Sequence, residues 1–353
     1  MVGSYLAGLL VAAGRDVALV ERRFVAAGAS GCNAGFVLLG MRHRYPEAIE
    51  RFGHAAAREI WTLTDENVRR MRALARLHGV EHRESGSSFL AVDLDEASQL
   101  RESTRLMQRD GFAVEYLDRD PLERGFQAAM LQPGDFALQP ALFTRAIARV
   151  SGATRYENDE VFDIRPDGAA MLVRSRQSLL RCGQVVLAVN AFASLLHSYF
   201  NRFMEPMRNQ VLLTEPLPGL IETMGYAAHG YHYFRQLPDG RLMIGGGRHR
   251  YFAQEAVFSN EVTAPVQAVL EEFLARYFPE GTRVGISRRW AGNDGLTVDG
   301  LPLVGQLPDE PRVSFAVGFS GHGNSMGLVA AERLADLLLK GRDPGIFGMR
   351  RFN

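Results

Sequence analysis

Three glycine-rich turns contain the residue types from which a site for a charged cofactor can be built. In chain order they are Ala29-Ser30-Gly31-Cys32-Asn33-Ala34-Gly35, Asp299-Gly300-Leu301-Pro302-Leu303-Val304-Gly305 and Gly318-Phe319-Ser320-Gly321-His322-Gly323-Asn324. Small residues let backbone N–H groups converge on a phosphate or on the edge of a ring. In the first turn, Ser30 and Asn33 add side-chain donors. A plain loop is the alternative for the first turn, and a hairpin loop for the second.

The third turn follows a predicted strand and precedes the last predicted helix. The unpaired N–H groups and the positive dipole end of that helix favour negative charge on a bound cofactor. His322 lies between two glycines in this turn. Its imidazole suits either a general base or a group that only packs against a cofactor or hydrogen-bonds to it.

A predicted strand places Tyr231, Tyr233 and Arg235 on one face, because alternate side chains of a strand point the same way. Two tyrosines followed by an arginine suit a small molecule that bears a carboxylate or an amine, and they suit a half-exposed sheet equally well. Cys32 has no base beside it in the sequence. We therefore interpret it as a small buried or loop thiol rather than a nucleophile.

The first turn is preceded by a helix and a strand. Apolar residues at helical spacing begin after Gly3 and stop at Gly14, and the strand Val17–Val20 ends in Glu21. A glycine at a helix start, with an acid about 20 residues further on, is typical of the back half of a dinucleotide-binding βαβ unit. A complete unit has a strand and two glycines ahead of Gly3, but the sequence begins at Met1. We expect the first strand of this unit to be missing.

The rest of the chain mixes two patterns of secondary structure. Helices are predicted at 46–79, 95–110, 140–150, 260–278 and 324–340, and strands at 89–92, 114–117, 153–156, 160–165, 170–174, 184–189, 211–214, 231–236, 241–244, 284–290 and 313–317. Pieces typical of α/β layers at the start, middle and end alternate with antiparallel and helical pieces. An interleaved two-domain protein of α/β (α+β overall) class accounts for this order.

Composition excludes several functions. Lys plus Arg and Asp plus Glu both number 40 in 353 residues, so there is no overall field to attract nucleic acid or an anionic membrane. The two cysteines do not have metal-ligand spacing, and we predict no metal site and a reducing, cytoplasmic location. No apolar run approaches the roughly 20 residues of a membrane span.

Six segments in this order resemble one known family. They are the first helix and acid-ended strand with ASGCNAGF, then VVLAVNAFAS, YFRQLPDGRLMIGGG, WAGNDGLTVDGLPLVG and VGFSGHGNSMG. The chain is similar to the FAD-dependent glycine/D-amino-acid oxidase (DAO) superfamily over nearly its whole length. Within it, the chain looks most like the sarcosine-oxidase-like and γ-glutamylputrescine-oxidase-like amine oxidases.

The resemblance implies non-covalent FAD, because relatives that attach the flavin use a cysteine near residue 290 and none stands there. Glu21 would hold the adenosine ribose, and the backbone of Val161 would meet the adenine. The remaining cofactor residues implied are Gly3, Ser30, Gly31, Asn33, Ala34, Gly35, Ala188, Asn190, Thr297, Gly300, Gly318, Phe319, Gly321, His322 and Gly323. A Rossmann-like FAD-binding domain would comprise 1–45, 137–200 and 285–345, and a substrate domain 46–136 and 201–284.

The implied reaction oxidises a C–N bond of an amine or amino acid by hydride transfer to flavin N5. Water then hydrolyses the imine, and oxygen reoxidises the flavin with release of hydrogen peroxide. Tyr233, Arg235 and His322 are the candidate catalytic residues, acting by substrate positioning. A dehydrogenase that passes electrons to a quinone or carrier is one alternative. A truncated, non-catalytic remnant is the other.

Relatives read close to GGGIVG where this chain reads MVG. The hypothesis that follows is that the true start lies upstream of Met1. An in-frame stop codon just before Met1 in the gene would contradict it.

Overall fold

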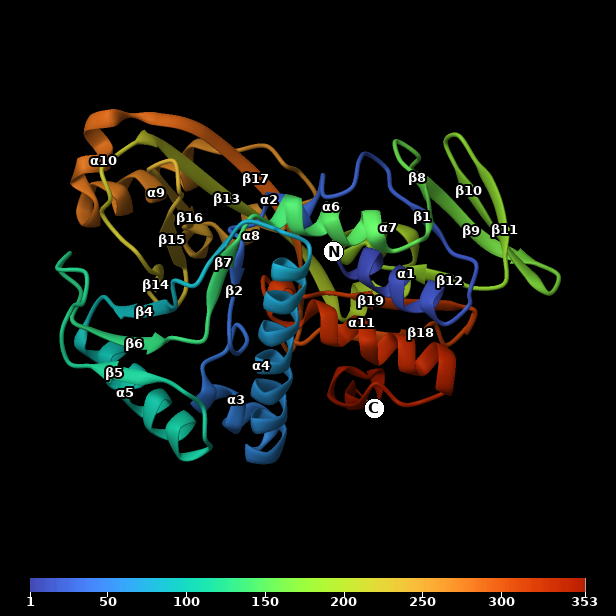
Figure 1. The fold of residues 1–353 in the computed structure, drawn as a ribbon, viewed down its shortest axis with the longest axis horizontal. Coiled ribbons are helices and arrows are strands. Elements are labelled where there is room, and N and C mark those ends of the chain that lie inside the picture. The colour runs from blue at the N-terminus through green and yellow to red at the C-terminus, as the bar shows by residue number, and fades with distance from the viewer. Residues whose placement is uncertain (353) are drawn as a thin grey trace.

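The computed structural model describes residues 1–352, in which two sheet-containing parts lie on either side of a long helix (Figure 1). That helix, α4 (His54–Leu77), follows α3 (Tyr45–Phe52). The sequence pattern predicted one helical region from 46 to 79. The structure divides it, because Gly53 between the two helices has φ = 82°, a left-handed conformation that ends α3.

The larger part is built on an eight-stranded sheet with the order β17-β13-β16-β15-β14-β4-β6-β5. Its strands are β4 (Ser87–Ala91), β5 (Glu115–Leu117), β6 (Ala128–Gln132), β13 (Met204–Pro216), β14 (Met224–Ala227), β15 (His232–Gln236), β16 (Arg241–Gly246) and β17 (Ile286–Thr297). All neighbours are antiparallel except β14 and β4. Helices α9 (Ala264–Tyr277) and α10 (Pro279–Val284) cover one face at the β13 end, and α5 (Leu94–Arg109) packs on β4 and β6.

The smaller part contains two further pairs of parallel strands. β1 (Ala18–Val20) pairs with β8 (Thr154–Tyr156), and β12 (Val185–Leu187) pairs with β19 (Val313–Val317), which also pairs antiparallel with β18 (Leu303–Gln306). The two groups are separate sheets. Helices α1 (Val2–Ala12), α6 (Pro140–Val150) and α11 (Gly323–Lys340) pack together beside them. This arrangement confirms the predicted α/β class.

Two small sheets complete the fold. β2 (Phe36–Val37), β7 (Phe136–Leu138) and β3 (His82–Arg83) form one of them between the two parts. β9 (Val161–Asp167), β10 (Ala170–Ser175) and β11 (Leu179–Cys182) form the other, which projects from the smaller part (Figure 1). Short helices are α2 (Ala29–Cys32), α7 (Ala193–Leu196) and α8 (Phe252–Glu255).

Three local predictions differ from the structure. The strand predicted at 284–290 is longer in the structure, where β17 runs from Ile286 to Thr297, because β13 supplies a hydrogen-bonding partner along its whole length. Tyr231 precedes β15 instead of lying on it. The helix expected from 260 begins at Ala264, with a proline in its first turn.

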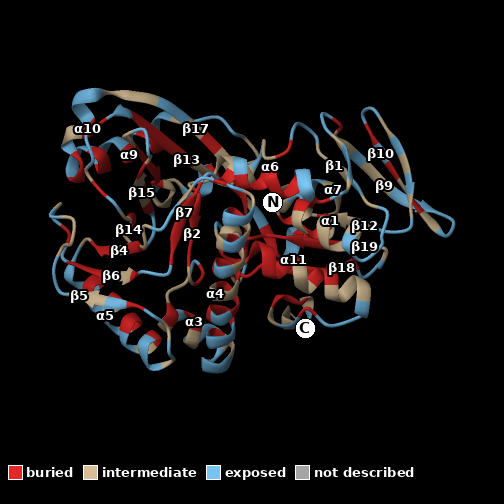
Figure 2. Cartoon of the chain, in the orientation of Figure 1, coloured by how far each residue is buried: buried red, intermediate tan, exposed pale blue. Residues whose placement is uncertain are grey.

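Buried residues lie where the parts meet (Figure 2). The most extensive cluster joins α4, α5 and α11 through residues such as Ile60, Leu100 and Leu334, each with no exposed surface. The domain boundaries remain a prediction. The segment 285–345 contributes β17 to the large sheet and β18, β19 and α11 to the smaller part.

Candidate functional site

The first and third glycine-rich turns meet through one asparagine. Asn33 Oδ1 accepts hydrogen bonds from Gly35 N (2.7 Å) and from Asn324 Nδ2 (3.0 Å), in the first turn of α11. Its Nδ2 donates to Ala29 O (2.9 Å) and Ser30 O (3.1 Å). The side chain therefore closes its own turn and fixes that turn against the N-terminus of the last long helix.

Two hydroxyl groups join the third turn to the end of β17, which directly precedes the second turn. Thr297 Oγ1 and Ser320 Oγ lie 2.9 Å apart, and Ser320 Oγ accepts from Thr297 N (3.0 Å). Gly318 has φ = 73°, and a Cβ there would lie 2.5 Å from Thr297 Cγ2. Gly300 has φ = 83° and faces the side chain of Arg42. Only glycine fits these two approaches.

The predicted nucleotide side gathers residues from four segments. A Cβ at Gly3 in α1 would lie 3.1 Å from that of Ala188, which follows β12. Ser30 Oγ accepts from the Met1 amino group at 2.8 Å. Burial lowers the pKa of that amino group to about 5, and the negative charge of Glu21, which follows β1, opposes the shift. The N-terminus of a helix, the acid after a parallel strand and the first turn therefore share one place.

Other predicted nucleotide-side residues have structural contacts of their own. Asn190 Oδ1 accepts from Gly318 N (2.9 Å) and Phe319 N (3.3 Å), which ties the end of β12 to the third turn. Phe319 is buried in the core. Val161 is the first residue of β9, and Asp159 just before it donates its N–H to Glu21 O at 3.0 Å.

The glycines of the first turn are required by close approaches. A Cβ at Gly31 would lie 2.1 Å from Ala26 O, and a Cβ at Gly35, where φ = 73°, would lie 2.1 Å from Leu138 O. Ala34 packs in the cluster around Phe36. The turn is thereby held tightly against β7 and the large sheet.

One face of the large sheet lies over this turn. Tyr233 and Tyr226 point to it, since both pack edge-on against Phe36 in β2, with ring centroids 6.1 and 5.4 Å away. Arg235 shares the face, because a Cβ on Gly35 would lie 3.0 Å from Arg235 Nη2. Trp290 does too, since its Nε1 donates to Cys32 O at 2.9 Å. We call this the inner face.

Burial changes the titration of the inner-face groups. It lowers the pKa of Arg235 to about 10 and raises the pKa of Tyr233 to about 12. Arg235 Nε is buried and has no hydrogen-bond partner among residues 1–352. A charged, partly unsatisfied guanidinium in this position is suited to an anionic partner.

His322 is the N-cap residue of α11. Burial, together with the nearby charges of Arg42, Arg248 and His43, lowers the pKa of His322 to about 4. Its Nδ1 lies 3.2 Å from Ser320 O, so that nitrogen carries the proton and Nε2 is an acceptor. The imidazole is therefore neutral near pH 7.

Three charged residues near the turns are not among the predicted site residues: Asp294 on β17, Arg42 after β2 and Arg248 after β16. Asp294 Oδ2 is buried and has no hydrogen-bond partner. The signal was present in WAGNDG, since Trp290, Gly292 and Asp294 alternate along a strand. It was hidden because the glycines suggested a turn.

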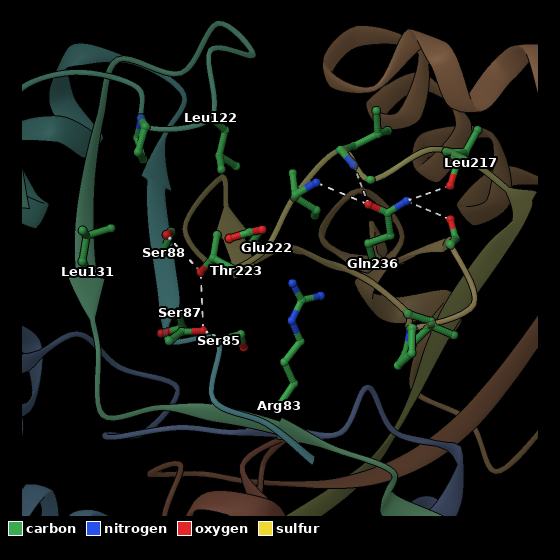
Figure 3. A pocket seen from close by; sticks show the side chains of 18 of the residues that line it. Arg83, Ser85, Ser87, Ser88, Leu122, Leu131, Leu217, Glu222, Thr223 and Gln236 are labelled. Atoms are coloured by element: carbon green, nitrogen blue, oxygen red, sulfur yellow. Dashed lines mark hydrogen bonds between the residues drawn. The ribbon is translucent and has the colours of Figure 1, made fainter. Parts of the chain in front are cut away.

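A cavity of about 1030 Å³ opens elsewhere, at the ends of β4, β14 and β15 (Figure 3). Gln236 closes one side of it by donating to Pro218 O (2.9 Å) and Gly240 O (2.8 Å) and accepting from Leu220 N (2.7 Å). None of the predicted site residues lines this cavity. It therefore carries none of the chemistry argued from the glycine-rich turns.

The family model of the DAO group, described as FAD dependent oxidoreductase, matches residues 1–337. The chain belongs to this family of FAD-dependent oxidoreductases. Gamma-glutamylputrescine oxidoreductase of Escherichia coli K12 is 26% identical over 352 residues, which cover 93% of this chain and 79% of the relative.

Solved structures share the fold of this DAO-family enzyme. Glycine oxidase from Geobacillus kaustophilus superposes with a TM-score of 0.82 at 22% identity, covering 99% of this chain and 95% of the other. L-proline dehydrogenase from P. horikoshii gives a TM-score of 0.80 at 22% identity, covering 98% and 92%.

The residues present fit the flavin of this DAO-family enzyme. Within residues 1–352, no acceptor is within hydrogen-bond distance of the N–H groups of Gly321, Gly323 and Asn324, at the start of an 18-residue helix. Such a helix terminus stabilises negative charge. Cys32 Sγ donates to Ala27 O at 3.6 Å, and burial raises the pKa of this thiol.

Among residues 1–352, no helix is long and apolar enough to cross a membrane. They also contain no group of three or more His, Cys, Asp or Glu side chains placed to bind a metal ion.

Proposed function

We propose that this enzyme oxidises a C–N bond of an amine or amino acid, with oxygen as the electron acceptor and non-covalently bound FAD as the cofactor. The observation that carries the proposal is the hydrogen bond between Asn33 and Asn324. It brings the first glycine-rich turn to the unpaired N–H groups of α11, directly beneath the tyrosines and arginine of the inner face. The names of the relatives, which act on amines and amino acids, support the same chemistry.

When bound, FAD would supply the acceptor for a hydride from the carbon next to the substrate nitrogen, and water would hydrolyse the resulting imine. The chain supplies position and charge. The N-terminus of α11 stabilises negative charge on the reduced cofactor. Tyr233 and Arg235 orient the substrate from the inner face, and the neutral His322 accepts a hydrogen bond through Nε2. Holding the C–H bond in line is the main contribution, so few acid–base groups are needed.

The cysteine geometry supports non-covalent binding. Cys32 is the thiol beside β17, and a Cβ at Gly292 would lie 3.5 Å from Cys32 Cβ. Because burial raises the pKa of this thiol, the reactive thiolate is scarce near pH 7.

Purified protein tests the proposal. It should be yellow with an absorption band at about 450 nm, and acid precipitation should release the flavin into solution. Amines and amino acids are then added one at a time without oxygen, and the true substrate class should bleach the band. Admitting air should restore the colour and release hydrogen peroxide. Bleaching without peroxide would indicate a dehydrogenase, and colourless protein that takes up no FAD would reject the proposal.

A further inference from the structure

The carboxylate of Asp294 is buried, and only one of its two oxygens accepts hydrogen bonds from residues 1–352. Oδ1 accepts from Asn190 Nδ2 (3.1 Å) and from Gly295 N (2.9 Å). Oδ2 is buried and has no partner among residues 1–352. Leaving a carboxylate oxygen unpaired in a protein interior is costly unless another group binds it.

The free oxygen points into the site formed by the glycine-rich turns. A Cβ built on Gly321, in the turn before α11, would lie 3.4 Å from Asp294 Oδ2 and would meet nothing else within 4 Å. On the other side, Gly292, two residues before Asp294 on the same strand, faces Cys32, whose Cβ lies 3.5 Å from where a Cβ of Gly292 would stand. The carboxylate therefore has bare backbone on the side of Gly321, where no other side chain lies within 4 Å of the Cβ position.

Two cations lie near this carboxylate without forming ion pairs with it. Burial raises the pKa of Asp294, while the charges of Arg248 and Arg42 oppose that rise. Neither guanidinium lies within 4.0 Å of an acidic group among the ion pairs of the described residues. Arg42 stacks its methylenes against Gly300, and Arg248 Nε is buried without a partner. The charges of these arginines favour the ionised form of Asp294 against the effect of burial, and neither arginine occupies its free oxygen.

We propose that Asp294 is a catalytic residue of this enzyme, which binds the substrate's ammonium group through Oδ2 and takes one proton from it. This rests on the proposed amine oxidation. The N–H bond breaks, an O–H bond forms on the carboxylate, and the nitrogen keeps the electron pair. The neutral amine that results is the form from which a hydride can leave the adjacent carbon. The same carboxylate selects amines over uncharged molecules of equal shape.

The binding test uses tert-butylammonium, whose nitrogen-bearing carbon has no hydrogen and so cannot be oxidised. Its binding to the holoenzyme is followed by the flavin absorbance difference and by the fluorescence of Trp290, which lies on the inner face. The wild type should bind tert-butylammonium more tightly than tert-butanol. Asp294→Asn should weaken the ammonium roughly ten- to hundred-fold, and should leave tert-butanol unchanged.

Matched variants separate chemistry from folding. Asp309→Asn makes the same change on an exposed residue that contacts His197 and should change nothing. Asp294→Glu keeps the carboxylate and should retain the preference for ammonium over alcohol, which covers the case in which Asp294→Asn unfolds. With the amine that bleaches the flavin, Asp294→Asn should lower kcat/KM by a similar factor at constant flavin content.

The results distinguish this inference from the proposed function. Amine oxidation with equal ammonium binding by wild type and Asp294→Asn would overturn the role of Asp294 and leave the function standing. Absence of any amine oxidation would reject the function. In that case the proton transfer assigned to Asp294 would fall with the function, and Asp294-dependent tert-butylammonium binding would support only its role in binding the ammonium group. Absence of such binding would overturn that role as well.

Discussion

Asp135, in the turn between β6 and β7, has a buried carboxyl group, and folding favours the protonated form of this group. Burial raises its pKa to about 7, against the opposing hydrogen bonds from Ser87 and from Leu39 N. Its usual pKa is about 3.9. Because the folded value is the higher one, its contribution to stability is complete below the usual pKa and is lost as pH rises through about 7.

Replacing Asp135 by Asn should remove that pH dependence. The free energy of unfolding of the wild type should fall relative to that of Asp135→Asn between pH 5 and pH 8. The change should reach a few kcal/mol at most, since one pKa unit corresponds to about 1.4 kcal/mol. Urea unfolding at both pH values measures it, and parallel pH curves for the two proteins would contradict the assignment.

At the scale of elements, the side chain of Asn67 bonds α4 to the backbone of α11. Asn67 Nδ2 donates to Asn324 O (2.7 Å), and Asn67 Oδ1 accepts from Leu328 N (2.9 Å). These are the two backbone groups that an i→i−4 bond of α11 would pair. Asn67 is completely buried. It therefore holds the first turn of α11, and with it the third glycine-rich turn, in place.

Asn67→Ala should destabilise the protein by about 1–3 kcal/mol, because two buried backbone groups lose their partner. It should also loosen flavin binding, which the midpoint of flavin release on heating would record beside the unfolding midpoint. Asn201→Ala, at an exposed position, is the matched control. An unchanged midpoint would mean that α11 closes the bond by itself.

How far the sequence predicts these elements depends on where their partners come from. Strand β19 and helix α6 follow from local patterns and end where the sequence predicts, at Val317 and Val150. The role of Asn67 cannot be predicted from its local pattern, because a helix rich in Arg and Glu indicates only a solvated face. The strand predicted at 284–290 is shorter than β17, because the glycines that follow Trp290 do not indicate a strand unless the pairing with β13 is known.

The same distinction holds within the site. The three turns could be located from their glycines, and their order was enough to suggest the family, which the family model confirms. The roles given to individual residues remain predictions. The alternation in WAGNDG could place Asp294 on a strand face but could not show its importance, which comes from an oxygen without a partner among residues 1–352, since pairing depends on segments distant in sequence.

At the scale of the whole molecule, the proposed site for flavin and substrate draws on segments from both parts of the fold. The predicted cofactor residues come from α1, the first turn, the end of β12 and the start of α11, and the inner face belongs to the large sheet. A ligand that binds only this folded arrangement stabilises it by mass action. Flavin binding should therefore be coupled to global unfolding.

Added FAD should raise the unfolding temperature in proportion to the logarithm of its concentration. At about 100 times the dissociation constant, the gain should be about 2.7 kcal/mol. Riboflavin, which lacks the diphosphate and adenosine, should give a smaller shift, because it cannot reach Glu21 or Gly3. Calorimetry measures both. Equal shifts from the two compounds would contradict a dinucleotide site at these residues.

The contact between Asn33 and Asn324 also determines when the enzyme can acquire its cofactor. The two residues are 291 positions apart. At 5–20 residues per second, a ribosome needs roughly 15–60 s to add the second after the first. Throughout that interval the nascent chain carries its first glycine-rich turn without the helix that completes it. We therefore expect FAD to bind only after the last long helix has been synthesised and has closed on the first glycine-rich turn.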